Sequence, residues 1–319
     1  MENLIVTTSP HLKHPRTTMH IMRDVLIALT PAAVAAVVIH GIYALFMILV
    51  TTAAAVLSEF LFNVITKKPH TTGDLSAAVT GLLLALNLST AAELWQCALG
   101  AVFAIVVVKC LFGGIGCNFA NPAITARVFL LVSFASTLGG GQLAGSPADP
   151  GVDLVGGATP LAALKAGTPV SELPNLIDML FGVRGGAIGE GCVIALLIGF
   201  VYLVARRVIS WTVPTALVGT VFVLALLITG APMIALYHVL SGGLLLGSIF
   251  MATDYSTTPL NKLGKVVFAI GVALITVLIR FFGSYPEGIS FAILIMNILS
   301  PYVEKLTARR PFGGVKDEK

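Results

Sequence analysis

The chain has 319 residues, of which 57% are hydrophobic and 11% are charged, and its formal net charge is +4. Soluble domains carry roughly 25% charged residues, so the composition excludes a water-soluble protein and predicts an all-α polytopic membrane protein surrounded by lipid. The sequence has no Walker A string, no H-E-x-x-H, no dinucleotide fingerprint and no metal-spaced cysteine cluster. Their absence argues against ATP-driven transport, a Rossmann site and a bound metal, and no nucleic-acid partner is expected.

Ten apolar segments follow a polar and basic N-terminal segment, residues 1–22, which lacks the pattern of a cleavable signal peptide. Most of them approach the roughly 20 residues that cross a bilayer, whereas the third is clearly shorter. The predicted segments are 23–40, 42–65, 75–88, 93–112, 122–137, 190–206, 212–230, 232–251, 263–282 and 286–303.

The positive charges indicate how these segments are oriented. An even number of crossings places both termini on one side of the membrane, and that side then collects 16 of the 19 lysines and arginines. Because cytoplasmic ends of membrane segments are enriched in Lys and Arg, both termini are predicted to be cytoplasmic. The long loop 138–189 is then predicted to be extracytoplasmic.

Two stretches of the chain resemble each other. Gly81-Leu-Leu-Leu-Ala-Leu is matched by Gly243-Leu-Leu-Leu-Gly-Ser, and Val102-Phe-Ala-Ile by Val267-Phe-Ala-Ile. Since each half holds five segments, an odd number, the copies run in opposite directions, as in the inverted repeats of transport folds. The alternative is a chance similarity between leucine-rich helices. The predicted organisation is a cytoplasmic segment at 1–22, membrane repeat 1 at 23–137, the loop at 138–189, membrane repeat 2 at 190–304 and a basic cytoplasmic tail at 305–319.

Polar residues mark the inner mouth of the fifth segment. Asn121 precedes Pro122, a pair expected at the first turn of a helix, and Asn118 lies three residues earlier. Arg127 follows inside the apolar segment, where an ionisable group is a functional candidate. The plain alternative is a helix cap followed by an arginine that snorkels to the membrane surface.

The predicted extracytoplasmic loop contains the string Gly156-Gly157-Ala158-Thr159-Pro160-Leu161. Small neighbours leave the Thr159 hydroxyl sterically open and Pro160 fixes the following turn, so the string suits a hydroxyl that meets a bulky group. A plain flexible loop would have the same composition. At the end of the loop, Glu190 is either a charge favoured by the N-terminus of the sixth segment or a residue beside a cofactor or ion.

Polar residues also interrupt the apolar segments elsewhere. Thr253 and Asp254 end the eighth segment. Asp254 is expected to cap backbone amides, to pair with a lysine such as Lys262, or to bind an ion or the edge of a cofactor. Glu59 and His238 each lie alone within an apolar segment, and either hydrogen-bonded packing or a relay would explain them.

Four strings together resemble the NqrB/RnfD family, and most closely its Rnf D subunits. String 156–161 resembles the family's Ser-Gly-Ala-Thr flavinylation motif, and string 118–122 resembles its Asn-Phe-Asn-Pro signature with one alanine added. Residues 251–254 match Met-Ala-Thr-Asp, and 189–191 lie where the family has Gly-Glu-Thr. The chain departs from the pattern at Gly156, which replaces the serine, and after Glu190, where Gly-Cys replaces Thr-Ser.

The resemblance implies a subunit of an ion-translocating ferredoxin:NAD⁺ oxidoreductase in a prokaryotic inner or plasma membrane, coupled to Na⁺ or H⁺ and not catalytic alone. It implies FMN joined to Thr159 by a phosphoester, a second flavin, riboflavin, held non-covalently among the helices, and a separate FMN-transferase for maturation. Other subunits of the Rnf complex would supply iron–sulfur centres, further flavins and the NAD site. The residues expected at cofactors are Thr159, Gly157, Ala158, Pro160, Asn118, Asn121, Arg127, Glu190, Thr253 and Asp254.

Two other functions fit parts of the sequence. A stand-alone channel or secondary transporter would also use an inverted repeat with broken helices. A scaffold without a cofactor would explain the fold alone. Neither function explains the four motif strings together. The presence of covalently bound flavin on the chain would distinguish the flavin-carrying subunit from both of them.

Overall fold

The structure is a computed structural model that describes residues 17–68, 71–138, 159–169, 173–182, 185–283 and 285–308. Within those ranges it is built of helices and holds no strand, in agreement with the predicted all-α class. The first part of the chain forms α1 (Thr18–His40), α2 (Ile42–Thr66), the short η1 (Thr72–Asp74), α3 (Ser76–Leu86), α4 (Leu94–Val102), its π-helical continuation η2 (Phe103–Cys110), α5 (Pro122–Ser133) and α6 (Ala135–Leu138).

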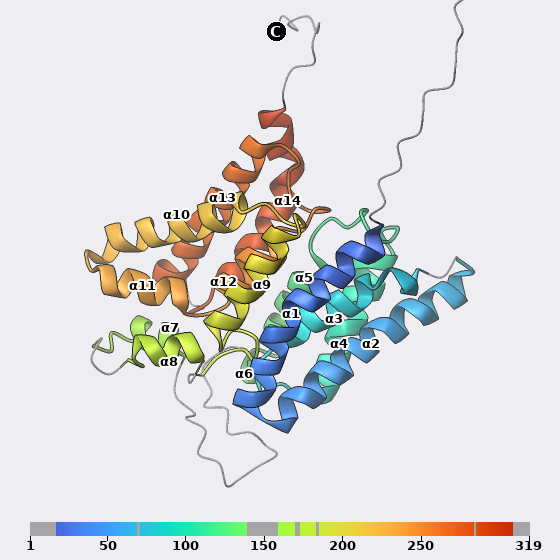
Figure 1. The fold of residues 1–319 in the computed structure, drawn as a ribbon, viewed down its shortest axis with the longest axis horizontal. Helices are drawn as coiled ribbons and strands as arrows, with labels where there is room; N and C mark the ends of the chain where they lie inside the picture. Colours follow the sequence, from blue (N-terminus) through green and yellow to red (C-terminus); the bar gives the residue numbers. More distant parts are fainter. Residues whose placement is uncertain are drawn as a thin grey trace, which may run out of the picture.

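The second part of the chain begins with two short helices and continues with longer apolar ones. These helices are α7 (Pro160–Lys165), α8 (Leu176–Phe181), α9 (Val193–Ala205), α10 (Thr212–Thr229), α11 (Pro232–Leu240), α12 (Leu244–Leu246), its π-helical continuation η4 (Gly247–Met251), α13 (Lys262–Phe282) and α14 (Ile289–Thr307). Figure 1 shows α1 to α5 gathered at one end of the molecule and α10, α11, α13 and α14 at the other, with α9 beside α1 between them.

Apolar helices coincide with all ten predicted segments. In the described part of the chain, five helices are long and apolar enough to cross a membrane, namely α1, α2, α10, α13 and α14. Helix α11 and α12–η4, which are bent by 63° at the break between them, together form either a sixth, broken span or a re-entrant loop. The remaining apolar helices, α3, α4–η2, α5 and α9, are shorter. The chain is a multi-pass membrane protein.

The structure differs from the predicted segments in the long loop 138–189. Helices α7 and α8 lie in this loop and were not predicted, because each has only six residues and so offers no apolar period. The fifth segment is also shorter than predicted. Helix α5 ends at Ser133, and Phe134 leaves the helical conformation before α6 continues to Leu138.

Close packing joins the helices around the short α3. A Cβ atom on Gly81 would lie 2.8 Å from the Cα atom of Thr52, so glycine lets α3 approach the backbone of α2. Helix α2 also packs against α4, while α13 packs against α10 and α14. The two ends of the molecule meet where α1 packs against α9 and α5 packs against α14. Polar side chains gather at the start and at the middle of α5, which places two candidate sites along one helix.

Candidate functional site

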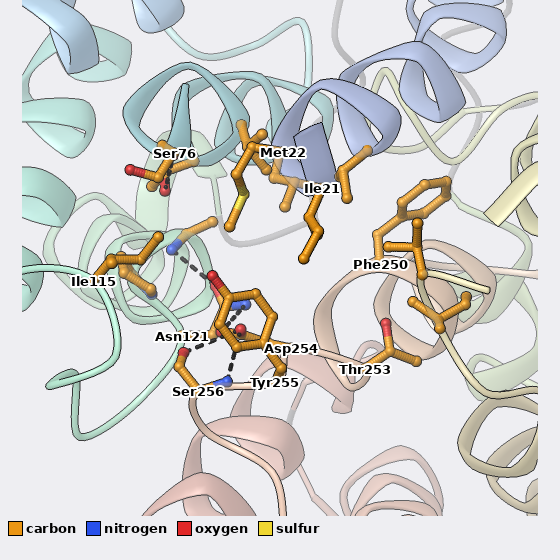
Figure 2. A pocket seen from close by; sticks show the side chains of 18 of the residues that line it. Ile21, Met22, Ser76, Ile115, Asn121, Phe250, Thr253, Asp254, Tyr255 and Ser256 are labelled. Atoms are coloured by element: carbon orange, nitrogen blue, oxygen red, sulfur yellow. Dashed lines mark hydrogen bonds between the residues drawn. The ribbon is translucent and has the colours of Figure 1, made fainter. Parts of the chain in front are cut away.

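A cavity, which we call the inner cavity, lies where the ends of several helices converge. It contains about 800 Å³ of space between atoms, including its open mouth. Its apolar wall includes Met22 of α1 and Phe250 of η4, as Figure 2 shows. The polar residues that line it come from α3, η2, the loop before α5 and the loop after η4, and they include Ser76, Lys109, Asn118, Asn121, Thr253 and Asp254.

Asn121 lines the inner cavity because it caps α5. Its side-chain oxygen accepts hydrogen bonds from the backbone N–H groups of Ala123 at 3.0 Å and Ile124 at 3.4 Å, and Pro122 occupies the first helical position. The predicted helix cap is therefore confirmed. With its oxygen engaged, the amide nitrogen of Asn121 donates across the cavity wall to Oδ2 of Asp254 at 3.5 Å (Figure 2).

Asp254 is held by the loop that follows η4. Its Oδ1 accepts from the backbone N–H of Ser256 at 3.2 Å and from the Ser256 hydroxyl at 3.0 Å, and its Oδ2 accepts from the Thr257 hydroxyl at 3.3 Å. It forms no ion pair with Lys262 among the described residues, so that alternative is wrong. Burial raises the pKa of Asp254 above its ordinary value, while the hydrogen bonds from Ser256 and Thr257 oppose this rise.

Two further cavity residues, Thr253 and Asn118, differ in whether their side-chain polar atoms have hydrogen-bond partners. The Thr253 hydroxyl donates to the carbonyl oxygen of Ile249 at 2.6 Å, one helical turn earlier. The side-chain oxygen of Asn118, in contrast, is buried and has no hydrogen-bond partner in the described part of the chain. An unsatisfied buried acceptor is unfavourable, so Asn118 is a ready partner for an N–H donor of a bound molecule.

A buried ion pair lies beside the same cavity. Nζ of Lys109, on η2, is 2.7 Å from Oε1 of Glu59, on α2. The sequence suggested that Glu59 lies alone in its apolar segment, but in the structure Lys109 is its partner. The Thr71 hydroxyl donates to the same Glu59 oxygen at 2.8 Å, and Lys109 also donates to the Ser76 hydroxyl at 2.5 Å.

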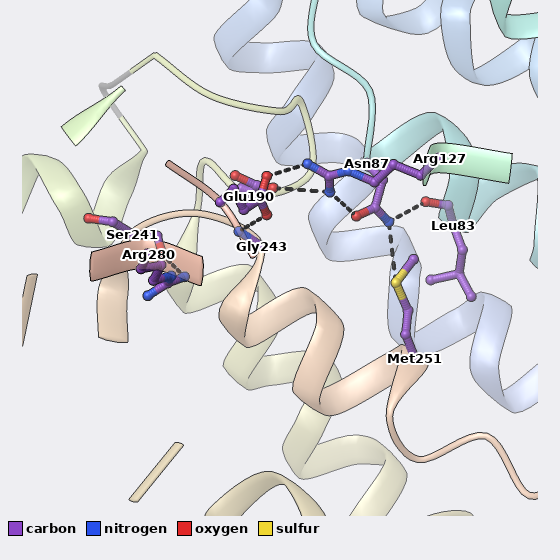
Figure 3. A network of polar contacts seen from close by, with 9 residues as sticks. Leu83, Asn87, Arg127, Glu190, Ser241, Gly243, Met251 and Arg280 are labelled. Carbon is purple, nitrogen blue, oxygen red and sulfur yellow. Dashed lines mark hydrogen bonds and ion pairs between the residues drawn. The ribbon is translucent and has the colours of Figure 1, made fainter. Parts of the chain in front are cut away.

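A second polar network lies around Arg127, at the middle of α5. The Arg127 side chain is buried and donates to Oδ1 of Asn87 at 2.5 Å, to Oε1 of Glu190 at 3.5 Å and to Oε2 of Glu287. Glu287 also accepts from the backbone N–H of Gly243 at 2.7 Å, at the break between α11 and α12 (Figure 3). Arg127 thus bridges two carboxylates and does not snorkel to the surface.

Thr159 lies apart from the polar residues around Asn121 and Asp254. It precedes α7, and its hydroxyl oxygen accepts from the backbone N–H of Ala162 at 3.2 Å, while Pro160 is buried at the first helical position. Lys165, at the other end of α7, donates to the carbonyl oxygens of Gly283 and, at 3.1 Å, Tyr285. Gly157 and Ala158, which were predicted to belong to this site, lie outside the described residues.

The predicted site residues therefore fall into three groups. Asn118, Asn121, Thr253 and Asp254 share the inner cavity, Arg127 and Glu190 share the second network, and Thr159 stands at the start of α7. Sequence reasoning missed Lys109, Asn87 and Glu287 as members of these groups. An ionisable residue inside a predicted apolar segment would have drawn attention to both Lys109 and Glu287, whereas the uncharged Asn87 gives no such signal.

Comparison with known proteins gives matches over nearly the whole chain. Residues 5–313 match the model of the NQR2, RnfD, RnfE family. The chain is 43% identical to the D subunit of the Na⁺-translocating ferredoxin:NAD⁺ oxidoreductase complex of Acetobacterium woodii, covering 99% of this chain and 98% of the relative. It is 37% identical to the D subunit of the proton-translocating ferredoxin:NAD⁺ oxidoreductase complex of Clostridium ljungdahlii, covering 97% and 96%. It is 34% identical to the D subunit of an ion-translocating oxidoreductase complex of Halorhodospira halophila, covering 97% and 95%.

Proposed function

The chain belongs to the NQR2, RnfD, RnfE family, and on that premise we propose that it is the membrane-embedded D subunit of an ion-pumping ferredoxin:NAD⁺ oxidoreductase complex. The observation that carries this proposal is the full-length match to relatives with that name. The subunit is not catalytic alone, because partner subunits would supply the iron–sulfur centres and the NAD site. Relatives named for Na⁺ and for protons match over similar lengths, so the proposal covers either ion.

Thr159 is the residue proposed to carry FMN, and its surroundings suit a phosphoester. Esterification replaces the hydroxyl hydrogen by the phosphorus of FMN and leaves the oxygen able to accept the hydrogen bond from Ala162. The helix cap can therefore persist after attachment. A separate FMN-transferase would attach the group, and the positive-inside rule would place Thr159 on the extracytoplasmic side, with both termini in the cytoplasm.

The inner cavity is the proposed site of a second flavin, riboflavin. Its wall fits a flat, partly polar ring, since Met22 and Phe250 offer apolar contacts and the unpartnered Asn118 oxygen can accept a hydrogen bond from a ring N–H. Asn121 and Asp254 would hold the polar edge. When bound, flavins supply the redox chemistry, and the protein positions the ring and sets its electrostatic surroundings.

A stand-alone channel or secondary transporter is the competing function, and the 63° break in the eighth segment is the observation that favours it. Flavin covalently bound to the chain separates the two functions. Co-expression with the FMN-transferase should give a band on a denaturing gel that retains flavin fluorescence. The fluorescence should disappear in Thr159→Ala and remain in Thr168→Ala, a matched change beyond α7. A wild-type band without fluorescence would remove the covalent FMN from the proposal.

A further inference from the structure

The ion pair between Lys109 and Glu59 is buried within a membrane-embedded helix pair. Lys109 is 2% exposed and Glu59 is 1% exposed, and their charged atoms are 2.7 Å apart. The free energy needed to remove two charges from water is often larger than the free energy gained from their attraction. Such a pair therefore contributes little to the stability of the fold. A pair of this kind beside an apolar wall calls for another use.

The position of Lys109 indicates what that use is. Lys109 lines the inner cavity, whereas Glu59 does not, so Lys109 is the partner of the ion pair that borders a bound molecule. In the described part of the chain, Lys109 is the cationic residue of that wall and Asp254 the acidic one. Lys109 also lies in the π-helical segment η2, and π-helical turns often occur at functional sites.

The contacts of Lys109 hold its ammonium group in place. The Ser76 hydroxyl accepts from Lys109 at 2.5 Å and donates onward to Asp74 at 2.5 Å, so the ammonium is fixed between Glu59 and the Ser76–Asp74 pair. Oε2 of Glu59 has no hydrogen-bond partner in the described part of the chain. In a low-dielectric wall, a fixed positive charge interacts strongly with charge that develops beside it.

We propose that Lys109 sets the reduction potential of the redox group in the inner cavity by stabilising the negative charge that the group gains when it is reduced. Lys109 thus acts through its positive charge, and its contacts with Glu59 and Ser76 fix the position of the ammonium group. This inference rests on the proposed riboflavin site. A positive charge that favours the reduced form raises the potential, so its removal lowers it.

The test measures a potential, which a purely structural role would not move. The full-length chain carrying Thr159→Ala, made without the FMN-transferase, is purified with riboflavin and titrated against redox mediators. Lys109→Gln should weaken the preference for reduced over oxidised riboflavin at least tenfold, a downward shift of about 30 mV for a two-electron couple. Lys109→Arg should largely keep the original potential. Lys262→Gln, which removes an exposed lysine, should leave it unchanged.

A double variant serves as a control for misfolding. Removing one partner of a buried pair leaves the other uncompensated, so Glu59→Leu with Lys109→Met replaces both by apolar side chains of similar size. The double variant should still lower the potential, because the charge that borders the cavity is lost. Riboflavin bound with an unchanged potential in both Lys109→Gln and the double variant would overturn the inference and leave the riboflavin site standing. A parent Thr159→Ala chain, with Lys109 and Glu59 intact, that retains no riboflavin would overturn the site and the inference together.

Discussion

Arg127 lies in a short apolar helix and meets two carboxylates and one amide there. Its partners come from distant parts of the chain, since Asn87 ends α3, Glu190 precedes α9 and Glu287 precedes α14. No spacing rule links these positions, so the sequence indicated that Arg127 and Glu190 were unusual without indicating that they pair. The pairing follows only from packing of α5 against α14.

Arg127→Gln should strongly destabilise the protein, because Glu190 and Glu287 would lose the buried cation that hydrogen-bonds to both of them. Breaking a buried ion pair from one side costs about 3–5 kcal/mol. Thermal unfolding in detergent should therefore show a large drop in the midpoint. Arg23→Gln, which removes an exposed arginine of α1, is the matched control and should change little. Equal midpoints for the two variants would contradict the role assigned to Arg127.

Asp254→Asn should lower ion transport driven by ferredoxin oxidation. The asparagine amide has one acceptor oxygen, and its NH2 group replaces the other carboxylate oxygen. This NH2 group would face the donors of either Asn121 or Ser256, so a hydrogen bond is lost in either orientation. Sealed vesicles that contain the complete complex are the material for the measurement. Asp178→Asn, in α8, provides the control for a lost negative charge. An unchanged transport rate in Asp254→Asn would remove Asp254 from the pathway.

Among the elements, the apolar period predicted where the ten apolar helical segments lie, of which five or six are long enough to cross a membrane, and the Asn-Pro pair predicted where α5 begins. The sequence did not predict α7 and α8, because a six-residue helix is specified by what it packs on rather than by its own pattern. It also did not predict the π-helical segments η2 and η4. These segments place Lys109 and Phe250 at the inner cavity, so the cavity could not be assembled from spacing.

Gly243, at the break between α11 and α12, leaves room for the network around Arg127. A Cβ atom there would lie 2.5 Å from Oε1 of Glu287 and 2.8 Å from Oε1 of Glu190, so a side chain would push the network around Arg127 apart. Gly243→Ala should cost about 1–3 kcal/mol, the usual range for overpacking, and lower the unfolding midpoint. Gly219→Ala, in α10 with no atom within 4 Å of the added carbon, should be neutral or slightly stabilising. The reverse order of midpoints would contradict this account.

At the scale of the whole molecule, α5 links the two polar centres. Asn121 at its first turn borders the inner cavity, and Arg127 lies six positions later, about 9 Å along the helix, in the second network. Both centres draw residues from the two ends of the molecule. Such a shared helix could couple the charge state of one centre to the packing of the other, which is what an ion pump requires.

Composition and charge were sufficient to predict the class of protein, and the motif strings were sufficient to predict its family. The two-fold relation between the halves stays a prediction. The short α3 and the bent pair of α11 and α12–η4 lie at the matching positions that it names. The pairing of helices could not be predicted, because contacts such as Glu59 with Lys109 join residues far apart in the chain.

The proposed function requires FMN joined covalently to Thr159, and the mass of the intact polypeptide reports such an attachment. Protein co-expressed with the FMN-transferase should be heavier than the bare chain by one esterified FMN, and fragmentation should place that mass on Thr159. The Thr159→Ala chain should have the mass of the bare polypeptide. A wild-type chain without added mass, or with the mass on another residue, would contradict the claim.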